Sequence, residues 1–513
     1  MLAKPDAPVV LSLTGIGKSF GAVVANQAID LDLRRGEILA LLGENGAGKT
    51  TLMNILFGHY VADEGSIRVA GEDGKLVPLA AGSPQAALAA GIGMVHQHFA
   101  LAESLTVLEN VVLGTRPLRS ISLDLAGARA KLGALMRDSG LDINPDRRVS
   151  RLGVGEKQRL EILKVLYRGA RILALDEPTA VLTPQEVDGL FVVLRRLVAN
   201  GLSIIFISHK LKEVIAIADR VAVLRGGRKV ADRVLEGTDR AMLAELMVGR
   251  QVAPTRRVQR APGPPRLVLN AIEVSGSHGR SGLSSVALQI LSGEILGIAG
   301  VSGNGQSLLA GVIGGTIVPA SGEIVLDGKP LRPSPRAMVQ AGIGRIPEDR
   351  QHEGVVGSLS IAENLALEGL DRDGVQRWGF LRFAAMRRHA ETAIRDYDVR
   401  CPGADAPIRL LSGGNMQKVI LARVFERQPR VVLANQPTRG LDIGASTDVH
   451  RRLLAARDRG VAVLLISEDL DELLALCDRV AVMVAGRLSA PMPVQAVTLE
   501  RLGLMMAGQA DAA

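Results

Sequence analysis

The chain contains two copies of one sequence pattern, and this repeat constrains the fold more than any other feature. RRGEILALLGENGAGKTTLM, around residue 43, recurs as LSGEILGIAGVSGNGQSLLA around residue 300. LALDEPTAVL recurs as VLANQPTRGL, and IADRVAVLRGGR recurs as LCDRVAVMVAGR. Equivalent positions lie roughly 258 residues apart, so two copies of one domain account for almost the whole chain.

The repeat predicts two α/β domains joined by a linker. Short β-branched runs such as EILALLG and LSIIFIS alternate with helical patterns, which favours a mixed, mainly parallel sheet flanked by helices. Apolar residues at helical spacing over 125–136 and 386–397 predict a helical insert in each copy. We place the domains at residues 1–249 and 267–513, and interpret the Pro- and Arg-rich residues 250–266 as an exposed, fairly stiff linker.

Composition limits the compartment and the partners. Two cysteines, Cys401 and Cys477, are too few for a disulfide framework, which favours a reducing compartment. The N-terminal residues lack the apolar core of a signal peptide and no apolar run reaches about 18 residues, so we expect any membrane role to be peripheral. The formal charge of +8 fits nucleic acid, an anionic membrane surface or an Arg-rich solvated surface, and charge alone does not decide.

The first copy carries a phosphate-binding loop. GENGAGKT, residues 43–50, follows an apolar strand pattern, precedes a helical one and matches G-x-x-x-x-G-K-[ST]. Glycines allow a tight loop whose backbone N–H groups surround phosphate oxygens, and a helix N-terminus adds positive potential. Lys49 would contact the β- and γ-phosphates, and the Thr50 hydroxyl would bind Mg²⁺. We assign nucleotide binding to Gly43, Asn45, Gly46, Gly48, Lys49, Thr50 and Thr51.

Two adjacent carboxylates end a buried strand in RILALDEP. Uncompensated carboxylates there are costly, so a metal ion and a positioned water are natural partners. We assign Asp176 to Mg²⁺ and Glu177 to the general base for the attacking water.

These motifs, in this order, resemble the ABC ATPases over essentially the full length of the chain. The resemblance implies that Gln97, in MVHQHF, senses Mg²⁺ and the transmembrane partner. It implies that His209, in FISHK, is the switch histidine that contacts the γ-phosphate. Phe20, in GKSFG, matches the position where the family stacks an aromatic ring on adenine.

The second copy has lost the charged groups of this chemistry. The replacements are Lys49 by Gln306, Gln97 by Glu348, Asp176 by Asn435, Glu177 by Gln436 and His209 by Glu468. Losing the cation and the carboxylate weakens phosphate and Mg²⁺ binding, and losing the base removes water activation. We therefore expect no useful hydrolysis at this copy's phosphate loop.

The signature loops have changed in the opposite copy. LSGGN of the second copy keeps the family's pattern, whereas LGVGE of the first copy lacks the serine. In ABC ATPases each ATP lies between one copy's phosphate loop and the other copy's signature loop. The resemblance thus places all intact parts in one composite site, with trans contributions from Ser412, Gly413, Gly414 and Asp442, where the first copy has Thr183 for Asp442.

Tandem copies without membrane spans occur in bacterial sugar and nucleoside importers and in soluble translation and repair ATPases. Here the linker is short and Pro-rich and zinc-binding cysteines are lacking, which favours an importer subunit over a ribosome- or nucleic-acid-associated ATPase. IPEDRQHEGVV and ANQPTRGLDIGA look more like the nucleoside group than the ribose or galactose group. The resemblance implies ATP and Mg²⁺, two permease subunits, an extracytoplasmic solute-binding protein, no nucleic acid, and a position on the cytoplasmic face of the cell membrane.

Overall fold

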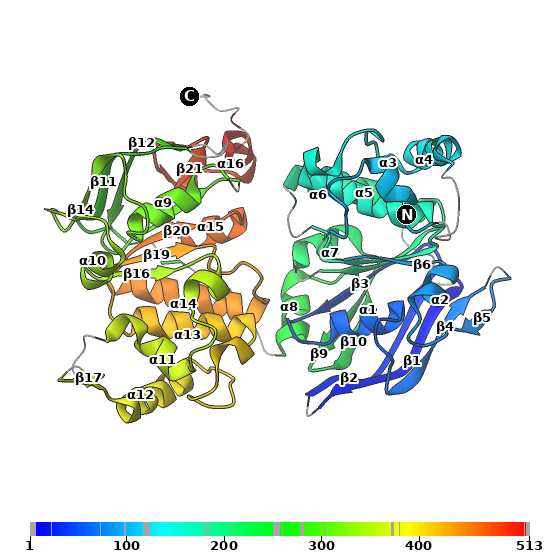
Figure 1. Cartoon of the computed structure of the whole chain (residues 1–513), viewed down its shortest axis with the longest axis horizontal. Coiled ribbons are helices and arrows are strands. Elements are labelled where there is room, and N and C mark those ends of the chain that lie inside the picture. The colour runs from blue at the N-terminus through cyan, green and yellow to red at the C-terminus, as the bar shows by residue number, and fades with distance from the viewer. Residues whose placement is uncertain are drawn as a thin grey trace. The chain divides into compact units, whose positions relative to one another are not determined.

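The computed structural model describes residues 7–21, 23–71, 73–96, 99–115, 124–179, 182, 184–208, 210–249, 257–258, 260–276, 282–301, 303–370, 374–378, 380–506 and 508. The chain divides into two compact units, Met1–Val252 (the first unit) and Ala253–Ala513 (the second unit). Figure 1 shows strands and helices interleaved along the chain in both units.

The first unit is built around a mainly parallel sheet. Its strand order is β10-β9-β3-β8-β7-β6, with bounds Arg228–Val234, Arg220–Arg225, Ile38–Gly43, Ser203–Ile207, Ile172–Asp176 and Ile92–Val95. Neighbours pair in parallel except β10, which runs antiparallel to β9. Strands β3, β7 and β8 are buried along their whole length. A parallel sheet covered on both faces requires such apolar strands.

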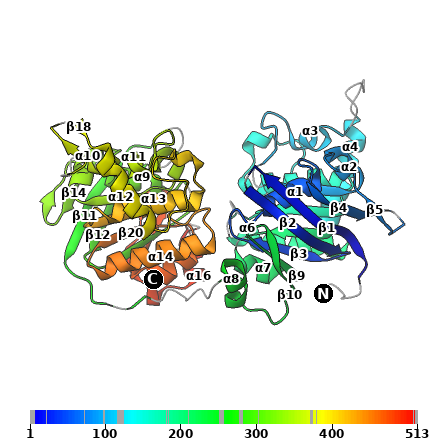
Figure 2. The same cartoon turned by 90° about the horizontal axis from the view of Figure 1, so that it is seen from below.

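A separate antiparallel sheet joins the N-terminal strands of this unit. Its order is β2-β1-β4-β5, with bounds Val23–Arg34, Val9–Phe20, Glu64–Ala70 and Leu76–Pro78. Figure 2 shows β1, β2 and β4 side by side. Together with helix α1, the two sheets enclose one apolar core of Leu, Ile, Val and Met side chains.

Several helices of the first unit start at recognisable side-chain caps. Thr106 and Glu109 form a capping box at α3, and Asp124 and Asp239 cap α4 and α8. Helices α3, α4 and α5 make up the insert, so the helix predicted over 125–136 is confirmed. The helices are α1 (Lys49–Phe57), α2 (Pro84–Ala89), α3 (Val107–Val112), α4 (Leu125–Ser139), η1 (Val149–Arg151), α5 (Val154–Tyr167), α6 (Pro184–Ala199), α7 (Leu211–Ile217) and α8 (Arg240–Val248).

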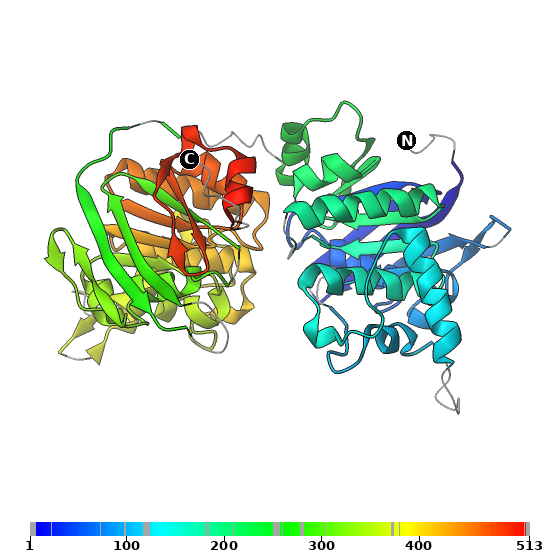
Figure 3. The ribbon, with the colours of Figure 1, turned by 90° about the horizontal axis from the view of Figure 1, so that it is seen from above.

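The second unit repeats this architecture. Its main sheet has the order β16-β19-β20-β13-β21-β22, with β23 also beside β21. The bounds are Ile343–Ile346, Val431–Asn435, Ala462–Ile466, Ile295–Ala299, Arg479–Val484, Arg487–Leu488 and Met492–Pro493. Its antiparallel sheet, β12-β11-β14-β15, has bounds Leu283–Leu291, Pro265–Val274, Ser321–Leu326 and Lys329–Pro330. Strands β11 and β12 are the long green ribbons of Figure 3.

Helices cover both faces of the second unit's main sheet. Figure 1 shows α9 on one side of it and α13 and α14 on the other, and each side has its own apolar core. The helix predicted over 386–397 is confirmed as α12. The helices are α9 (Gln306–Ile313), α10 (Pro335–Gln340), η2 (Arg350–Gly354), α11 (Ile361–Ala366), η3 (Leu367–Gly369), α12 (Phe383–Asp396), η4 (Ile408–Leu410), α13 (Gly413–Phe425), α14 (Ile443–Asp458), α15 (Leu470–Leu476), η5 (Val494–Ala496) and α16 (Leu499–Met506).

The predicted linker is partly held against the second unit. Residues 250–256 lie outside the described residues, and strand β11 already begins at Pro265. The Arg257 guanidinium donates to the Cys477 carbonyl and lies 3.5 Å from the Asp478 carboxylate. Val258 is exposed as predicted, but the Arg257 side chain is only 13% exposed. The prediction of an exposed linker is therefore wrong at Arg257, because a carbonyl and a carboxylate of the second unit bind its charge.

Candidate functional site

Parallel register brings the predicted groups of the first unit to one edge of its sheet. Leu41 of β3 and Asp176 of β7 both align with Ile207 of β8. The carboxyl ends of these strands therefore lie together, although their sequences are far apart. Residues 43–50, the acidic pair and the segment after β8 all start from this edge, which is where open α/β sheets bind ligands.

The phosphate loop has the backbone conformation that its glycines permit. Gly46 and Gly48 have φ angles of 82° and 98°, in the left-handed region, and Gly48 caps α1. A Cβ atom on Gly48 would lie 2.3 Å from the Ala25 carbonyl oxygen, so a larger residue cannot be placed there without a shift. The turn leaves the N-terminus of α1 directed at the loop, which suits a phosphate group.

The Lys49 side chain is folded into this loop. It is 7% exposed, and its ammonium group donates to the carbonyl oxygens of Gly43 at 2.7 Å and Glu44 at 3.0 Å. These two hydrogen bonds place the ammonium group inside the loop, where phosphate oxygens would be bound. Thr50 is exposed and Thr51 half-buried in the first turn of α1, and Asn45 is exposed beside them.

Asp176 and Glu177 differ in burial. Asp176 is 8% exposed, and burial raises the pKa of its carboxyl group; the Glu177 carboxylate adds to that shift and the Lys49 charge opposes it. Glu177 is only half-buried and has a φ angle of 48°, a left-handed conformation that non-glycine residues seldom adopt. Its backbone N–H donates to Ile207 at 3.0 Å, which holds the turn after β7 against β8.

Two predicted catalytic residues, Gln97 and His209, lie outside the described residues. Phe20 is described at the end of β1, 45% exposed. Its ring makes an edge contact with Tyr60, with centroids 5.5 Å apart, and the Lys18 ammonium lies 5.5 Å from the ring centroid. Tyr60 was not predicted from the sequence, since a lone Tyr after a helix carries no motif.

The predicted signature residues meet at two helix N-termini of the second unit. Ser412 caps α13, and Gly413 and Gly414 form its first turn. Asp442 caps α14 and accepts a hydrogen bond from the Ala445 N–H at 2.8 Å. A Cβ atom on Gly414 would be 3.6 Å from the Ala445 side chain, so the two helix starts lie side by side. Helix N-termini attract anions.

The equivalent helix of the first unit, α5, begins differently. Its Glu156 carboxylate accepts a hydrogen bond from the Gly153 N–H at 2.8 Å and pairs with Arg147 at 2.8 Å. In α13 the corresponding Asn415 is uncharged and donates to the Ser412 hydroxyl at 3.0 Å. The carboxylate at the start of α5 disfavours a phosphate group there. The start of α13 has no such carboxylate and does not disfavour phosphate.

Three of the degenerate residues of the second unit, Gln306, Asn435 and Gln436, are neutral groups at the places of Lys49, Asp176 and Glu177. Gln306 and Asn435 are each 8% exposed, as buried as Lys49 and Asp176. The Gln306 amide donates to the Val301 carbonyl at 3.1 Å, in the manner of Lys49. Gln436 repeats the φ angle of 48°, and its side chain accepts from the Glu468 N–H at 3.3 Å. The backbone of the site is retained where the charges are lost.

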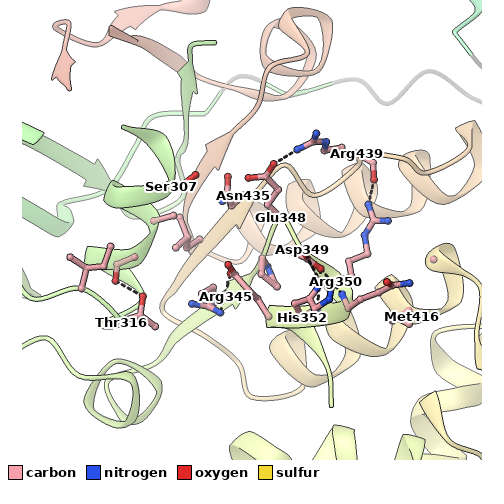
Figure 4. Close-up of a pocket in the computed structure, with 18 residues that line it drawn as sticks. Ser307, Thr316, Arg345, Glu348, Asp349, Arg350, His352, Met416, Asn435 and Arg439 are labelled. Atoms are coloured by element: carbon pink, nitrogen blue, oxygen red, sulfur yellow. Dashed lines mark hydrogen bonds and ion pairs between the residues drawn. The ribbon is translucent and has the colours of Figure 1, made fainter. Parts of the chain in front are cut away.

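A cavity of about 700 Å³ lies beside these residues in the second unit. Figure 4 shows Ser307 and Asn435 on one side, and Glu348 beneath Arg439. The Glu348 carboxylate forms an ion pair with Arg439, and the Arg350 guanidinium donates to the Arg439 carbonyl. Burial and the Arg439 charge lower the pKa of Arg350 to about 10. Arginine side chains therefore line this cavity beside Glu348, whose counterpart in the first copy is Gln97.

Each unit also contains a buried carboxylate network that sequence reasoning missed. Glu213 accepts from the hydroxyls of Thr179 at 2.6 Å and Ser208 at 2.9 Å, and pairs with Lys210 at 3.1 Å. It thereby joins the turn after Glu177 to the segment that leads to His209. The sequence carries a signal for this network, because S-x-x-x-x-E occurs in both copies, at residues 208–213 and 467–472.

In the second unit Glu472 makes the equivalent contacts. It accepts from Thr438 at 2.8 Å and Ser467 at 2.6 Å, and His450 lies 2.8 Å away. Because the network persists where the catalytic charges are gone, its primary role is to hold the two segments together.

The described residues contain no cluster of three or more His, Cys, Asp or Glu side chains able to hold a metal ion. Proteins bind Mg²⁺ through one or two carboxylates together with substrate phosphates and water. The Asp176 carboxylate is buried at the end of β7, and the Lys49 charge opposes the rise of its pKa. In the part of the chain that the structure describes, no helix has both the length and the apolar character needed to span a bilayer.

Fold and site together define a tandem P-loop ATPase. The family model described as "ABC transporter" matches residues 26–180 and again 283–439, and the chain belongs to this family. ABC ATPase domains bind ATP, and the family couples ATPase activity to transport.

Relatives with the same tandem organisation match over nearly the whole chain. The nucleoside import ATP-binding protein NupA of Lactococcus lactis is 42% identical and covers 97% of this chain and 98% of its own. The guanosine import ATP-binding protein NupO of Bacillus subtilis is 44% identical, and the match covers 97% of this chain and 97% of that protein. The glucose import ATP-binding protein TsgD13 of Haloferax volcanii is 45% identical and covers 98% of this chain and 96% of its own.

A solved structure of an RNase-L inhibitor has a similar tandem fold, with a TM-score of 0.63. It is 18% identical and the match covers 97% of this chain and 92% of that chain. At this identity the similarity concerns the fold alone.

Proposed function

We propose that the chain is the ATP-hydrolysing subunit of an importer whose solute is a nucleoside. The observation that carries this proposal is the full-length similarity to NupA and NupO, which are named for nucleoside and guanosine import. TsgD13, named for glucose import, is equally similar and makes a sugar the second candidate solute. The solute would be handled by the partner permeases, so no residue of this chain chooses between them.

Hydrolysis is assigned to the first unit. The loop 43–50 would bind the phosphates of ATP, with Lys49 against the β- and γ-phosphates and Phe20 against the adenine. Glu177 would accept a proton from the attacking water, a role worth about 10²–10⁴ in rate. His209 would contact the γ-phosphate. The position of Glu177 supports this role, because its half-buried side chain directly follows the buried Asp176 at the carboxyl end of β7.

Mg²⁺ is assigned to Thr50, Asp176 and Gln97. Bound there, it would neutralise charge on the phosphates of ATP. The burial of Asp176 supports the assignment, since a buried carboxylate with a raised pKa gains stability from a cation beside it.

The second unit would complete this site in trans through Ser412, Gly413, Gly414 and Asp442. The contrast between the helix starts supports this, because α13 has no carboxylate where α5 has Glu156. The phosphate loop at Gln306 would not hydrolyse ATP, because it lacks the cation, the metal ligand and the base. We keep residues 1–249 and 267–513 as the domains and 250–266 as their linker.

We also assign two permease subunits and an extracytoplasmic solute-binding protein as partners, with this chain on the cytoplasmic face of the cell membrane. The importer names of the relatives support these assignments. We expect no role in binding nucleic acid, since the similarity to ribosome-associated ATPases such as the recycling factor aABCE1 is only 18% in identity.

Uptake by vesicles that contain this chain and its permeases tests the proposal. Labelled guanosine should accumulate in an ATP-dependent manner that Glu177→Gln abolishes, and excess unlabelled glucose should not compete. Accumulation of glucose in place of guanosine would select the second candidate. RNA-dependent sedimentation with ribosomes, and no uptake of either solute, would contradict the importer function.

A further inference from the structure

A short hairpin of the second unit exposes several large apolar side chains. Strand β17 (Gln376–Arg377) pairs with β18 (Phe380–Leu381) in antiparallel register, directly before α12. Trp378, in the turn, is 89% exposed, Phe380 is 78% exposed and Phe383 is 63% exposed. Figures 1 and 2 show β17 and β18 at the edge of the unit beside α12.

This concentration is unusual for the chain. It has one Trp, three Tyr and eight Phe among 513 residues, yet three of these aromatics fall within six positions and contribute little to any core. Trp378 also has a φ angle of 52°, in the left-handed region where Gly or Asn is normally found in a hairpin turn. Neither local backbone preference nor packing accounts for an indole here. Exposed apolar patches of this kind mark interaction sites.

Arginines outnumber acidic residues around the aromatics. Residues 371–391 include five arginines and three acidic residues, Asp371, Asp373 and Glu391, and Arg387 pairs with Glu391 and Asp405. Arg377 lies directly opposite Phe380 in the hairpin, and its guanidinium is 5.2 Å from the Trp378 ring centroid. Neither Arg377 nor Arg382 has an ion-pair partner among the described residues. Within the described part of the chain, the hairpin therefore presents exposed aromatic rings together with two arginines that have no ion-pair partner there.

The size of the patch favours a lipid surface over a protein partner. Aromatic side chains bury about 150–250 Å² each, so three of them fall short of the roughly 800 Å² that each partner contributes to a standard protein interface. Trp belongs to the residues enriched at the boundary between lipid tails and headgroups. Arginine beside it can bind lipid phosphates, and basic residues near an anionic surface are attracted to it.

We propose that this hairpin, residues 374–378 and 380–383, inserts its aromatic side chains into the interface of an anionic lipid bilayer. Trp378, Phe380 and Phe383 enter the headgroup region, and Arg377 and Arg382 bind the phosphates around them. The contact is weak and reversible, and it orients the subunit on the membrane. It involves no residue of the ATP site.

The chain provides its own probe for this contact. Because Trp378 is the single Trp, the intrinsic Trp emission of the full-length protein reports on the hairpin alone. Vesicles with equal parts of phosphatidylcholine and phosphatidylglycerol should shift the emission to shorter wavelength, and brominated acyl chains should quench it. High salt should reverse both effects, since charge attraction is screened. Pure phosphatidylcholine vesicles should have little effect.

Substitutions separate the hairpin from the general positive charge of the chain. Arg377→Glu/Arg382→Glu should weaken binding to the anionic vesicles at least about tenfold. Arg487→Glu/Arg501→Glu makes the same charge change at two exposed positions of β22 and α16 and should leave binding unchanged. Trp378→Ala/Phe380→Ala should reduce co-sedimentation with vesicles, while ATP hydrolysis, which reports on folding, is retained.

Three results would overturn the proposal. The first is an emission spectrum that anionic vesicles do not change. The second is an equal loss of binding in both pairs of Arg variants. The third is an emission shift that requires permease proteins in the vesicles, which would identify a protein partner. The vesicle measurement needs neither ATP nor solute, so its failure would leave the proposed import of nucleosides standing, and failed uptake would leave this proposal standing.

Discussion

Arg439 and Glu348 form an ion pair in the second unit, between the turn after β19 and the segment after β16. In the first copy the equivalent positions hold Ala180 and Gln97, so neither charge occurs there. The pair therefore belongs to the copy that has lost its catalytic groups. It connects two segments that the first unit is proposed to connect through bound Mg²⁺ and ATP.

The ion pair should contribute modestly to stability and nothing to hydrolysis. Arg439 and Glu348 side chains are 51% and 29% exposed, so we expect a coupling free energy of about 0.2–1 kcal/mol between Glu348→Gln and Arg439→Gln. Urea unfolding of the two single variants and the double variant measures it. The ATPase rate should stay at the unsubstituted level in all three. A rate as low as that of Glu177→Gln would mean that hydrolysis depends on this site.

Glu177 and Ser412 should act on the same ATP. Groups that serve one transition state are strongly non-additive, so Glu177→Gln/Ser412→Ala should be scarcely slower than Glu177→Gln alone. Single-turnover hydrolysis measures this. Losses that multiply in the double variant would contradict the composite site.

Two matched controls belong to the same experiment. Gly153→Ser and Gln436→Glu each restore one part of the other site, and neither should rescue Glu177→Gln, because Gln306 and Asn435 still lack the cation and the metal ligand. Recovered turnover in the double variant Glu177→Gln/Gln436→Glu would show that the second phosphate loop can hydrolyse ATP.

Substitutions in the two buried carboxylate networks should have different effects. The substitution in the first unit should slow hydrolysis, and the one in the second unit should lower stability. Glu213→Gln loses charge-assisted hydrogen bonds to Thr179 and Ser208, which flank the catalytic segments, so hydrolysis should slow by about tenfold while ATP binding is kept. Glu472→Gln should lower the free energy of unfolding by about 1–3 kcal/mol and leave hydrolysis unchanged. Equal loss of hydrolysis in both variants would contradict this division.

The two cysteines should differ in reactivity. Burial raises the pKa of the Cys477 thiol well above its usual value; Glu472 and Asp478 add to that shift and Arg257 opposes it. The thiolate is the reactive form, so a raised pKa moves labelling to higher pH. Maleimide should modify the half-buried Cys401 in the native protein and Cys477 only in denaturant. Native labelling of both at neutral pH would contradict the burial of Cys477.

Local pattern was sufficient for much of the fold and part of the site. Glycine spacing around Lys49, the carboxylates after an apolar strand and the helical periodicity of 125–136 depend only on neighbouring residues. Because the chain contains an internal repeat, its two copies can be aligned, and the alignment shows that the charges of Lys49 and Asp176 are lost at Gln306 and Asn435. The edge of the sheet where these groups meet follows from parallel strand topology, which alternating strand and helix patterns already indicated.

Other features depended on the tertiary structure. Arg439 lies 91 residues from Glu348, and Glu213 lies 34 from Thr179, so only the folded chain decides that their charges and hydroxyls meet. The exposure of Trp378 could not be predicted either, because an aromatic run reads equally as core or surface until the neighbouring elements have packed. The sequence alone determined which residues are capable of the chemistry. Packing decided which of them face one another, because a side chain's partners and its contact with water are set by segments distant in the chain.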